Sequence, residues 1–241
     1  TGVSLHSKPC KGTAIMAGKH ALITGATGMV GGHALEYLLE SSEVARVTVL
    51  TRRSTGVVHP KLTEVIHTDF EDYSSVRDHL VGVDMCLFCL GVYWGKVSRD
   101  QYHSLTASAP LACGRALKEL SPNAAFLLLS GEGADQSQKT RVAFGRDKGE
   151  AEAGLLAMGL GRVHFFRPAL IQPAVKRKAP NRGYAFSAVV LYPLVRVLYP
   201  NGQIKSNDLA LAMVHVGIHG GPTNIIHNKA IRGIVRGIDR E

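Results

Sequence analysis

The stretch over residues 20–36, HALITGATGMVGGHALE, constrains the fold of this chain more than any other. A short apolar run ends at Thr24, and glycines follow at every third position, Gly25, Gly28 and Gly31. Apolar residues then recur at helical spacing, which predicts a strand, a tight turn and a helix in that order. A helix that begins at such a turn directs unpaired N–H groups towards an anion, and glycines let a pyrophosphate approach the backbone. The stretch is therefore predicted to bind a dinucleotide.

Predicted strands and helices alternate along the rest of the chain. Apolar and β-branched runs predict five more strands, over residues 44–51, 62–67, 83–90, 124–129 and 163–166. Helical patterns cover residues 98–120, 141–159, 207–219 and 229–236. This alternation predicts an α/β fold, a doubly wound parallel sheet of the Rossmann type with a small C-terminal helical elaboration.

The length of 241 residues and a hydrophobic content of 45% suit one substantial core. We expect a poorly structured extension over residues 1–18 and a single NAD(P)-binding domain over residues 19–241. Its part from about residue 170 onward is expected to lie on the substrate side.

The chain carries a formal charge of +9, from 28 basic and 19 acidic residues. Aromatic residues make up only 6% of the sequence, and the basic residues form no long helical stripe. A dispersed surplus of charge is therefore favoured over a surface that binds nucleic acid.

Cys86 and Cys89 form a C-x-x-C pattern inside a predicted buried strand. Residues three apart on a strand point to opposite faces, so we expect reduced core thiols and no metal site. Reduced thiols indicate a cytoplasmic location, and the lysine-containing, acid-free lead segment leaves a mitochondrial one as the alternative.

No apolar run approaches the ~20 residues that a transmembrane helix needs. The nearest, over residues 185–200, is interrupted by Pro193 and Arg196. It is predicted to be a buried helix or a surface for a homodimer or protein partner, with interfacial membrane docking as the outside alternative.

The second predicted strand ends at Arg52 and Arg53, and no acidic residue lies between Arg46 and Gly56. An acid at this place would bind the ribose 2′-hydroxyl of NAD, whereas an arginine can bind the 2′-phosphate of NADP. The sequence therefore favours NADP(H) over NAD(H), and the alternative is a solvated basic turn.

The chain resembles an atypical short-chain dehydrogenase/reductase from about His20 to Ile234. The resemblance rests on TGATGMVG (24–31), LTRR (50–53), DF (69–70), CLG (89–91), LSGEGAD (129–135), DKGEAE (147–152) and FRPALIQP (166–173). The last three segments are most similar to the Tat-interacting-protein-like oxidoreductase branch and its bacterial relatives.

The resemblance implies a set of residues that hold NADP(H). They are Gly25, Thr27, Gly28, Met29, Val30, Arg52, Arg53, Asp69, Phe70, Leu90 and Gly91. It also implies that Lys148 hydrogen-bonds the nicotinamide ribose and that residues 168–171, with Pro168, Ala169 and Ile171, close over the nicotinamide. From the residues alone, Asp69 could instead cap the helix expected near Tyr73.

Two departures from the resembled family bear on catalysis. The family's acid/base is a tyrosine four residues before the lysine, whose charge lowers the pKa of the phenol. Here Phe144 precedes Lys148, and Gly131 stands where many relatives have a second serine, which leaves Ser130 as the hydroxyl at that place.

Two functions follow from these departures. One is a carbonyl oxidoreductase that acts on a small-molecule substrate, with Lys148 and Ser130 orienting it. Its proton would come from Tyr93, Tyr102, His103 or water. The other is an inactive NADP(H)-binding regulatory or assembly protein. Epimerisation or lyase chemistry is a third, weaker alternative.

Overall fold

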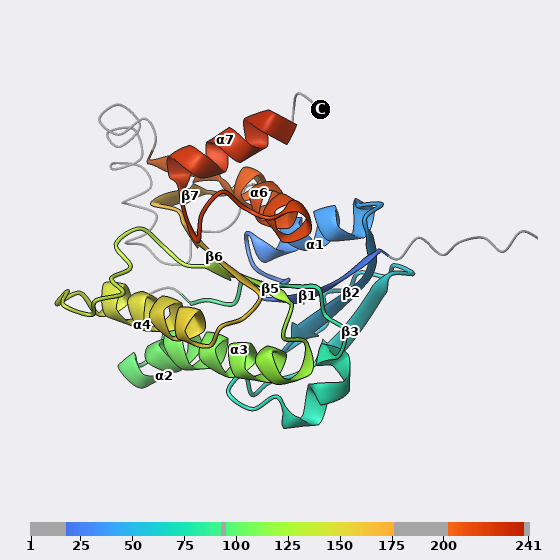
Figure 1. The fold of residues 1–241 in the computed structure, drawn as a ribbon, viewed down its shortest axis with the longest axis horizontal. Coiled ribbons are helices and arrows are strands. Elements are labelled where there is room, and N and C mark those ends of the chain that lie inside the picture. Colours follow the sequence, from blue (N-terminus) through green and yellow to red (C-terminus); the bar gives the residue numbers. More distant parts are fainter. Residues whose placement is uncertain (1–17, 93–94, 176–201, 239–241) are drawn as a thin grey trace, which may run out of the picture.

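The computed structural model describes residues 18–92, 95–175 and 202–238. Seven mutually parallel strands form the main sheet in the order β3-β2-β1-β4-β5-β6-β9 (Figure 1). These strands are β1 (Lys19–Thr24), β2 (Val44–Thr51), β3 (Leu62–Ile66), β4 (Met85–Phe88), β5 (Ala125–Leu129), β6 (Arg162–Arg167) and β9 (Ile225–His227). A second sheet pairs β7 (Leu170–Gln172) with β8 (Gln203–Lys205).

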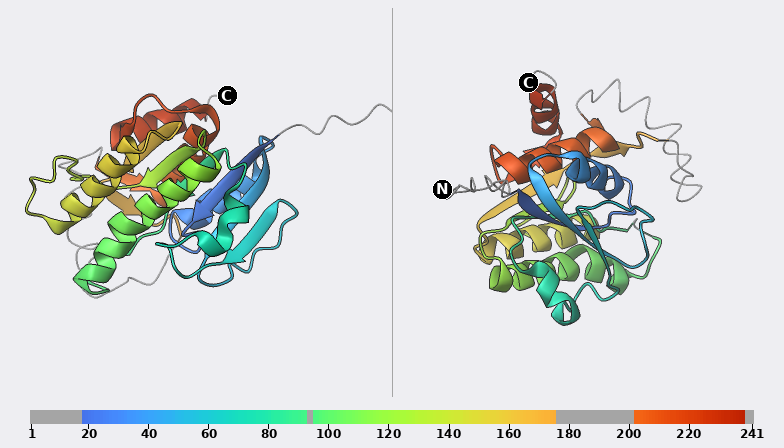
Figure 2. Two further views of the ribbon diagram at one scale, coloured as in Figure 1. Left: turned by 60° about the horizontal axis from the view of Figure 1, so that its bottom comes forward. Right: turned by 90° about the vertical axis from the view of Figure 1, so that its right-hand side faces the viewer.

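Helices cover both faces of the main sheet, so the predicted doubly wound fold is confirmed (Figures 1 and 2). On one face lie α1 (Gly31–Glu40), α6 (Ser206–His219) and α7 (Asn228–Ile238). The other face carries the 3₁₀ helix η1 (Ser74–Leu80), α3 (Ala109–Leu120) and α4 (Ala143–Ala157). The strand order turns at β1, which lies between β2 and β4, and doubly wound sheets bind their ligands at this switch point.

The two cysteines of the C-x-x-C pattern belong to different layers of the core. Cys86 packs in the cluster beneath η1 and α3, whereas Cys89 packs in the cluster beneath α1 and α6. Both are free thiols and both are buried. The predicted alternation of their side chains is confirmed, and one metal ion could not join them.

The structure departs from the sequence-based prediction in two places. The sequence predicts six strands, and the structure adds three: β9 at the edge of the main sheet, and β7 and β8, which form the second sheet. The helix expected over residues 98–120 is not regular: α2 (Arg99–His103) passes through a π-helical turn, Ser104–Ser108, into α3. Pro110 explains this, because it has no N–H to donate to the carbonyl of Thr106 one turn earlier.

Some expectations fall on residues outside those described. They are the extension before Gly18 and the apolar segment over residues 185–200. Within the described ranges, no helix combines the length and apolar character needed to cross a bilayer. The single-domain boundaries and the substrate-side role of the C-terminal part stay predictions.

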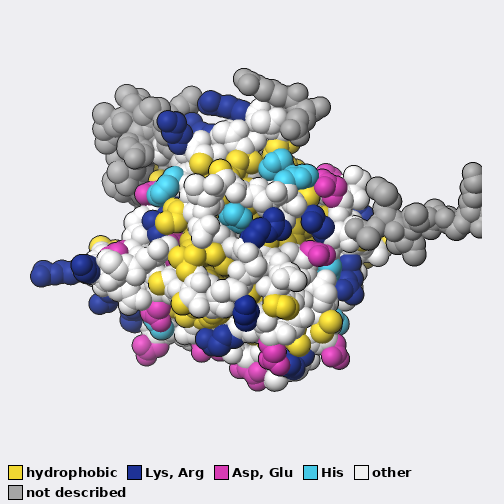
Figure 3. Space-filling view, in the orientation of Figure 1, with side chains coloured by type: hydrophobic (Ala, Val, Ile, Leu, Met, Phe, Trp, Pro, Cys, Tyr) yellow, Lys and Arg dark blue, Asp and Glu magenta, His cyan; other side chains and the backbone are white. Residues whose placement is uncertain are grey.

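Charged side chains are interspersed on the face shown in Figure 3. Lysines and arginines lie among aspartates and glutamates there and do not gather into one stripe. This distribution agrees with a dispersed surplus of positive charge.

His20 lies buried at the start of β1 and is held between two side chains. Its Nε2 lies 2.8 Å from Oγ1 of Thr48, and its Nδ1 lies 2.8 Å from Nη2 of Arg46. Nδ1 also lies 3.1 Å from the carbonyl oxygen of Gly82. Burial first, and the charge of Arg46 second, lower the pKa of His20 to about 4.

This neutral histidine should make the free energy of unfolding depend on pH. In the unfolded chain His20 has the ordinary pKa of 6.5 and is protonated below that pH. In the folded chain His20 stays neutral down to about pH 4. The contribution of His20 to the free energy of unfolding is therefore fully present above about pH 6.5. It falls, by up to about 3 kcal/mol, as the pH drops towards 4. Urea unfolding on both sides of this window should show a smaller loss in His20→Gln. Equal losses in the two proteins would contradict the assignment.

Candidate cofactor and catalytic site

The glycine turn lies tightly between the end of β4 and the start of α1. Gly25 has a φ of +73°, and a Cβ there would lie 2.5 Å from the carbonyl oxygen of Cys89. A Cβ at Gly31 would lie 2.2 Å from the carbonyl oxygen of Gly25, and Gly28 N donates to the same oxygen at 2.8 Å. The turn therefore needs glycine for its backbone conformation and for its close packing.

The first turn of α1 is open to an anion. Its N-cap residue, Val30, makes no side-chain hydrogen bond to the helix, and the first turn contains no acidic residue. The buried Oγ1 of Thr24, next to the turn, has no hydrogen-bond partner among the described residues. A helix start without a side-chain cap or a carboxylate, and with an orphan hydroxyl beside it, suits a bound phosphate group.

A pocket of about 390 Å³ opens beside this turn. Its lining consists of Gly25, Thr27, Leu50, Thr51, Arg52, Arg53, Phe70 and Leu90. The structure therefore brings together six of the predicted cofactor residues, from the glycine turn, the end of β2 and the loops after β3 and β4. The lining includes two guanidinium groups and no carboxylate.

Phe70 and Asp69 are adjacent in sequence, but only Phe70 is buried and lines the pocket. Phe70 is buried, and the ring of His67 meets it edge-on with centroids 5.1 Å apart. The exposed carboxylate of Asp69 accepts a hydrogen bond from Glu71 N at 3.0 Å and is not part of the pocket lining. The contact of Asp69 with an adenine stays a prediction.

Lys148 extends from α4 towards the carboxyl end of β5. Its Nζ donates to the carbonyl oxygen of Leu129 at 2.9 Å. Burial lowers the pKa of Lys148 to about 8, although the negative charges near it act in the opposite direction. The thiol of Cys89 lies near enough to interact with this ammonium, and burial raises the pKa of that thiol to about 12. Lys148 therefore lies near Cys89, whose carbonyl group packs against Gly25 of the glycine turn.

The two departures from the resembled family touch one another. A Cβ at Gly131 would lie 2.5 Å from Cζ of Phe144, the ring atom to which a tyrosine hydroxyl is attached. A serine at position 131 is therefore incompatible with this position of the ring. Position 144 lacks the phenol and position 131 lacks the hydroxyl of the resembled family, and the half-buried Phe144 ring packs against the backbone of Gly131.

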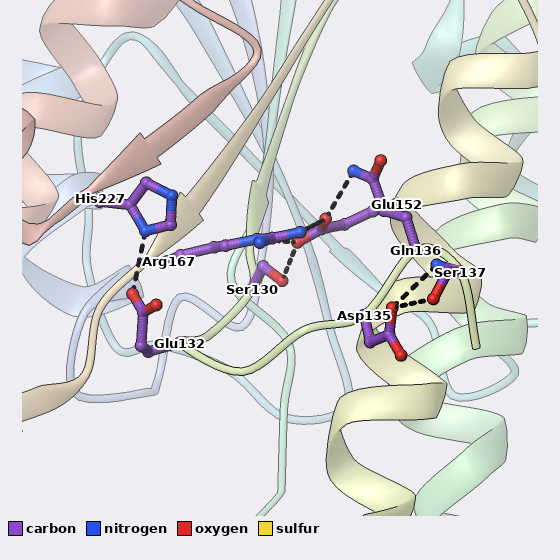
Figure 4. A network of polar contacts seen from close by, with 8 residues as sticks. All are labelled: Ser130, Glu132, Asp135, Gln136, Ser137, Glu152, Arg167 and His227. Atoms are coloured by element: carbon purple, nitrogen blue, oxygen red, sulfur yellow. Dashed lines mark hydrogen bonds and ion pairs between the residues drawn. The ribbon is translucent and has the colours of Figure 1, made fainter. Parts of the chain in front are cut away.

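Ser130 belongs to a buried polar network (Figure 4). Its Oγ donates to Oε1 of Glu152 at 2.5 Å, and Glu152 is completely buried. Arg167 donates to both oxygens of Glu152, and Gln136 donates to one of them. In this arrangement the hydroxyl proton of Ser130 points into the protein. Sequence reasoning assigned no role to Glu152 or Arg167, although both lie in segments that carry the family resemblance.

The other candidate proton donors lie on or near α2. Tyr102 is buried and hydrogen-bonded to Thr106, and burial raises the pKa of its phenol. His103 pairs with Glu150 at 3.1 Å. Tyr93 lies outside the described residues.

The segment expected to close over the nicotinamide runs from β6 into β7. The carbonyl oxygen of Pro168 accepts a hydrogen bond from Glu132 N at 3.0 Å, Ala169 is exposed, and Ile171 pairs in register with Ile204 of β8. The structure thus fixes the backbone of this segment beside the loop after β5. Its contact with a cofactor stays a prediction, as does that of Met29, Val30 and Gly91.

One group of potential metal ligands lies within the described part of the chain. Ligand atoms of His103, Asp147 and Glu150 lie within 4.8 Å of one another. Asp147, however, is already bound by two hydrogen bonds of 2.7 Å from Arg99, and His103 already pairs with Glu150. These contacts favour an ion-pair cluster over a metal site. At the end of α6, His219 pairs with Glu43 at 3.3 Å.

Comparison with known proteins gives one matching family and several similar relatives. The sequence model of the NAD dependent epimerase/dehydratase family matches residues 21–144. "Protein fmp52, mitochondrial" of Emericella nidulans is 28% identical over 203 residues, which cover 81% of this chain and 86% of that protein. The protein of the same name in Aspergillus niger is 30% identical over 173 residues, 68% of this chain and 73% of that protein.

Solved structures of similar fold include complexes with both nicotinamide dinucleotides. A short chain dehydrogenase from Burkholderia cenocepacia in complex with NADP has a TM-score of 0.64 at 17% identity, covering 94% of each chain. The Bordetella bronchiseptica enzyme WbmH in complex with NAD⁺ has a TM-score of 0.62 at 19% identity, covering 87% of this chain and 74% of that one. At these identities the likeness shows the fold alone.

Proposed function

The chain belongs to the NAD dependent epimerase/dehydratase family, and on that premise we propose that it is an NADP(H)-dependent carbonyl oxidoreductase. One observation carries the proposal: the pocket beside the glycine turn is bounded by Arg52 and Arg53 at the end of β2. A guanidinium can bind a ribose 2′-phosphate through two hydrogen bonds. Because no carboxylate lines this pocket, the 2′-hydroxyl of NAD(H) would find no acidic partner there.

The residues of the site would divide the work as follows. The turn from Gly25 to Val30 and the open N-terminus of α1 would hold the pyrophosphate, and Arg52 and Arg53 the 2′-phosphate. Phe70 and Leu90 would bound the adenosine end. The cofactor supplies the hydride when it is bound. Lys148 would hold the ribose and keep a proton at the carboxyl end of β5, close to the place where a substrate oxygen would lie.

A specific observation favours a second candidate, an NADP(H)-binding regulatory or assembly protein without turnover. Position 144 has no phenol, and the proton of Ser130 is directed to Glu152. A site in this form lacks both hydroxyl groups that would polarise a carbonyl. The two candidates share the cofactor and differ in whether NADPH is consumed.

The discriminating experiment is a panel of aldehydes and ketones incubated with NADPH and purified protein. Loss of NADPH absorbance with formation of the matching alcohol would support the oxidoreductase. Binding of NADPH with no loss across the panel would support the regulatory protein. A sugar substrate that is epimerised or dehydrated, with NADPH left intact, would support the third alternative and contradict carbonyl reduction.

Phe144→Tyr should increase the rate of carbonyl reduction. The new hydroxyl would sit on Cζ, one helical turn from Lys148, where the ammonium can lower the pKa of the phenol. A positioned general acid contributes about 10²–10⁴-fold, and we expect a gain of at least about tenfold because the ring must shift slightly from Gly131. Phe144→Leu, which removes the ring without adding a hydroxyl, serves as the control. An unchanged rate in a folded, NADPH-binding Phe144→Tyr protein would contradict a substrate site at this position.

We further propose a mitochondrial location, because the relatives in Emericella nidulans and Aspergillus niger carry that word in their names. The cytoplasmic expectation has no such support. Within the family, the segments 147–152 and 166–173 are the basis for proposing the Tat-interacting-protein-like branch. A homodimer or protein partner stays a proposal that rests on residues 185–200.

A further inference from the structure

Lys148 and Glu152 lie four residues apart on α4, a spacing at which opposite charges usually pair. In this structure their polar atoms have different partners. The ammonium donates to a neutral acceptor, the carbonyl oxygen of Leu129, at 2.9 Å. The carboxylate turns to β6 and to the loop after β5. Lys148 and Glu152 therefore do not hydrogen-bond each other, although their spacing on the helix favours an ion pair.

Four hydrogen bonds occupy the carboxylate of Glu152 (Figure 4). Oε1 accepts from Ser130 at 2.5 Å and from Nε of Arg167 at 3.0 Å. Oε2 accepts from Gln136 at 2.8 Å and from Nη2 of Arg167 at 2.5 Å. A carboxylate has about four lone-pair sites, so this one has no acceptor position left for Lys148.

The second acidic neighbour of Lys148 is held in the same way. Arg99 donates to both oxygens of Asp147 at 2.7 Å, and the Asp147 side chain is buried. Each carboxylate close to the lysine on α4 is thus clamped by an arginine from another element. Neither carboxylate hydrogen-bonds the buried ammonium, and burial outweighs their charges in lowering the pKa of Lys148 to about 8.

We propose that Arg167 is a positioning residue for Lys148: by occupying Glu152 it keeps that carboxylate from capturing the ammonium, and it leaves Lys148 to donate the proton that a phenol at position 144 cannot. The second half of this proposal rests on the function proposed above. In the reductive direction, an N–H bond of Lys148 breaks and an O–H bond forms at the substrate carbonyl oxygen, while the carbonyl carbon receives hydride from the reduced nicotinamide. Lys148 is left as a neutral amine and regains its proton from water.

The test is a titration of Lys148 that requires neither cofactor nor substrate. In protein labelled with [¹³C]lysine, the Cε chemical shift of Lys148 is followed against pH and assigned by its absence in Lys148→Arg. The wild-type midpoint is expected near pH 8, the pKa to which burial lowers this lysine. Arg167→Met should raise it by at least about one pH unit, because Glu152 then becomes free to pair with Lys148.

Matched variants separate this effect from general damage. Arg162→Met removes an exposed arginine from the same strand and should leave the midpoint unchanged. The double variant Arg167→Met/Glu152→Gln leaves no unpaired buried charge, and its midpoint should stay at or below the wild-type value. If Arg167→Met alone does not fold, the conservative variant Arg167→Lys decides: a lysine cannot bind both carboxylate oxygens of Glu152 in the bidentate way of an arginine, so the midpoint should still rise.

Two results would overturn the positioning role: a wild-type Lys148 that titrates like an exposed lysine, or a folded Arg167→Met with an unchanged midpoint. The proton-donor role has its own readout. With a reducible substrate, kcat should fall as the pH rises through the measured midpoint, and Lys148→Arg should lose kcat far more than affinity for NADPH. Failure of NADPH to bind at all would refute the proposed function and the proton-donor role, while the titration would still decide the role of Arg167.

Discussion

Gly25→Ala is expected to lower the affinity for NADPH by at least about a hundredfold. The residue has a φ of +73°, and the added Cβ would lie 2.5 Å from the carbonyl oxygen of Cys89. The positive φ alone costs about 1–2 kcal/mol for a residue with a side chain. The clash cannot be relieved by a rotamer change, because both partners are backbone or Cβ. The turn must move away from β4, and the N–H groups that it presents to a pyrophosphate move with it.

Gly82→Ala is the matched control for this variant. Gly82 has a nearly identical φ of +69°, but a Cβ there would meet no atom within 4 Å. It should therefore lose a similar amount of stability from backbone strain and keep its affinity for NADPH. Calorimetric titration of both variants, after their melting temperatures are compared, separates the two effects. Equal affinity of Gly25→Ala and the wild type would show that the turn does not hold the cofactor.

Arg52→Glu is expected to weaken NADPH binding by roughly a hundredfold and NADH binding much less. The change removes a charge-assisted pair with the 2′-phosphate, worth about 1.5–3 kcal/mol, and places a like charge beside it. NADH has a hydroxyl at this position, and the carboxylate of a glutamate can accept a hydrogen bond from it. The ratio of the two dissociation constants should therefore invert.

The control for Arg52→Glu is Arg115→Glu, which changes the net charge equally at an exposed position on α3. Its affinities for the two dinucleotides should differ little from those of the wild type, since long-range effects of exposed charges are screened. Equal losses of NADPH and NADH affinity in Arg52→Glu would contradict the 2′-phosphate assignment.

The sequence predicts those parts of this fold whose causes are local. The glycine spacing, the β-branched runs and their alternation with helices lead directly to a doubly wound sheet, and the structure confirms it. β9 is missed because three residues, Ile225–His227, are too few to show a period, and pairing with β6 is what makes them a strand. The π-helical turn before α3 is missed because a helical pattern gives no sign of a backbone bond that Pro110 cannot make.

The same distinction explains the site. Arg52 and Arg53 could be placed at the pocket because they follow the end of one strand directly. The clamp on Glu152 joins Ser130, Gln136 and Arg167 from separate segments, and only the packed structure brings them together. Sequence reasoning left Ser130 as a free hydroxyl near the substrate for this reason. The contact between Gly131 and Phe144 likewise depends on tertiary packing and could not be inferred from the sequence.

Calorimetric titration of the wild-type protein with NADPH and NADH decides whether the pocket between the glycine turn and the end of β2 binds NADP(H). The two ligands differ only in the 2′-phosphate, so their comparison isolates the place where Arg52 and Arg53 lie. We predict saturable binding of NADPH with one site per chain and an affinity for NADH at least about tenfold weaker. Absence of binding to both dinucleotides would contradict the account of the site from Gly25 onward, and a preference for NADH would contradict the assignment of the cofactor.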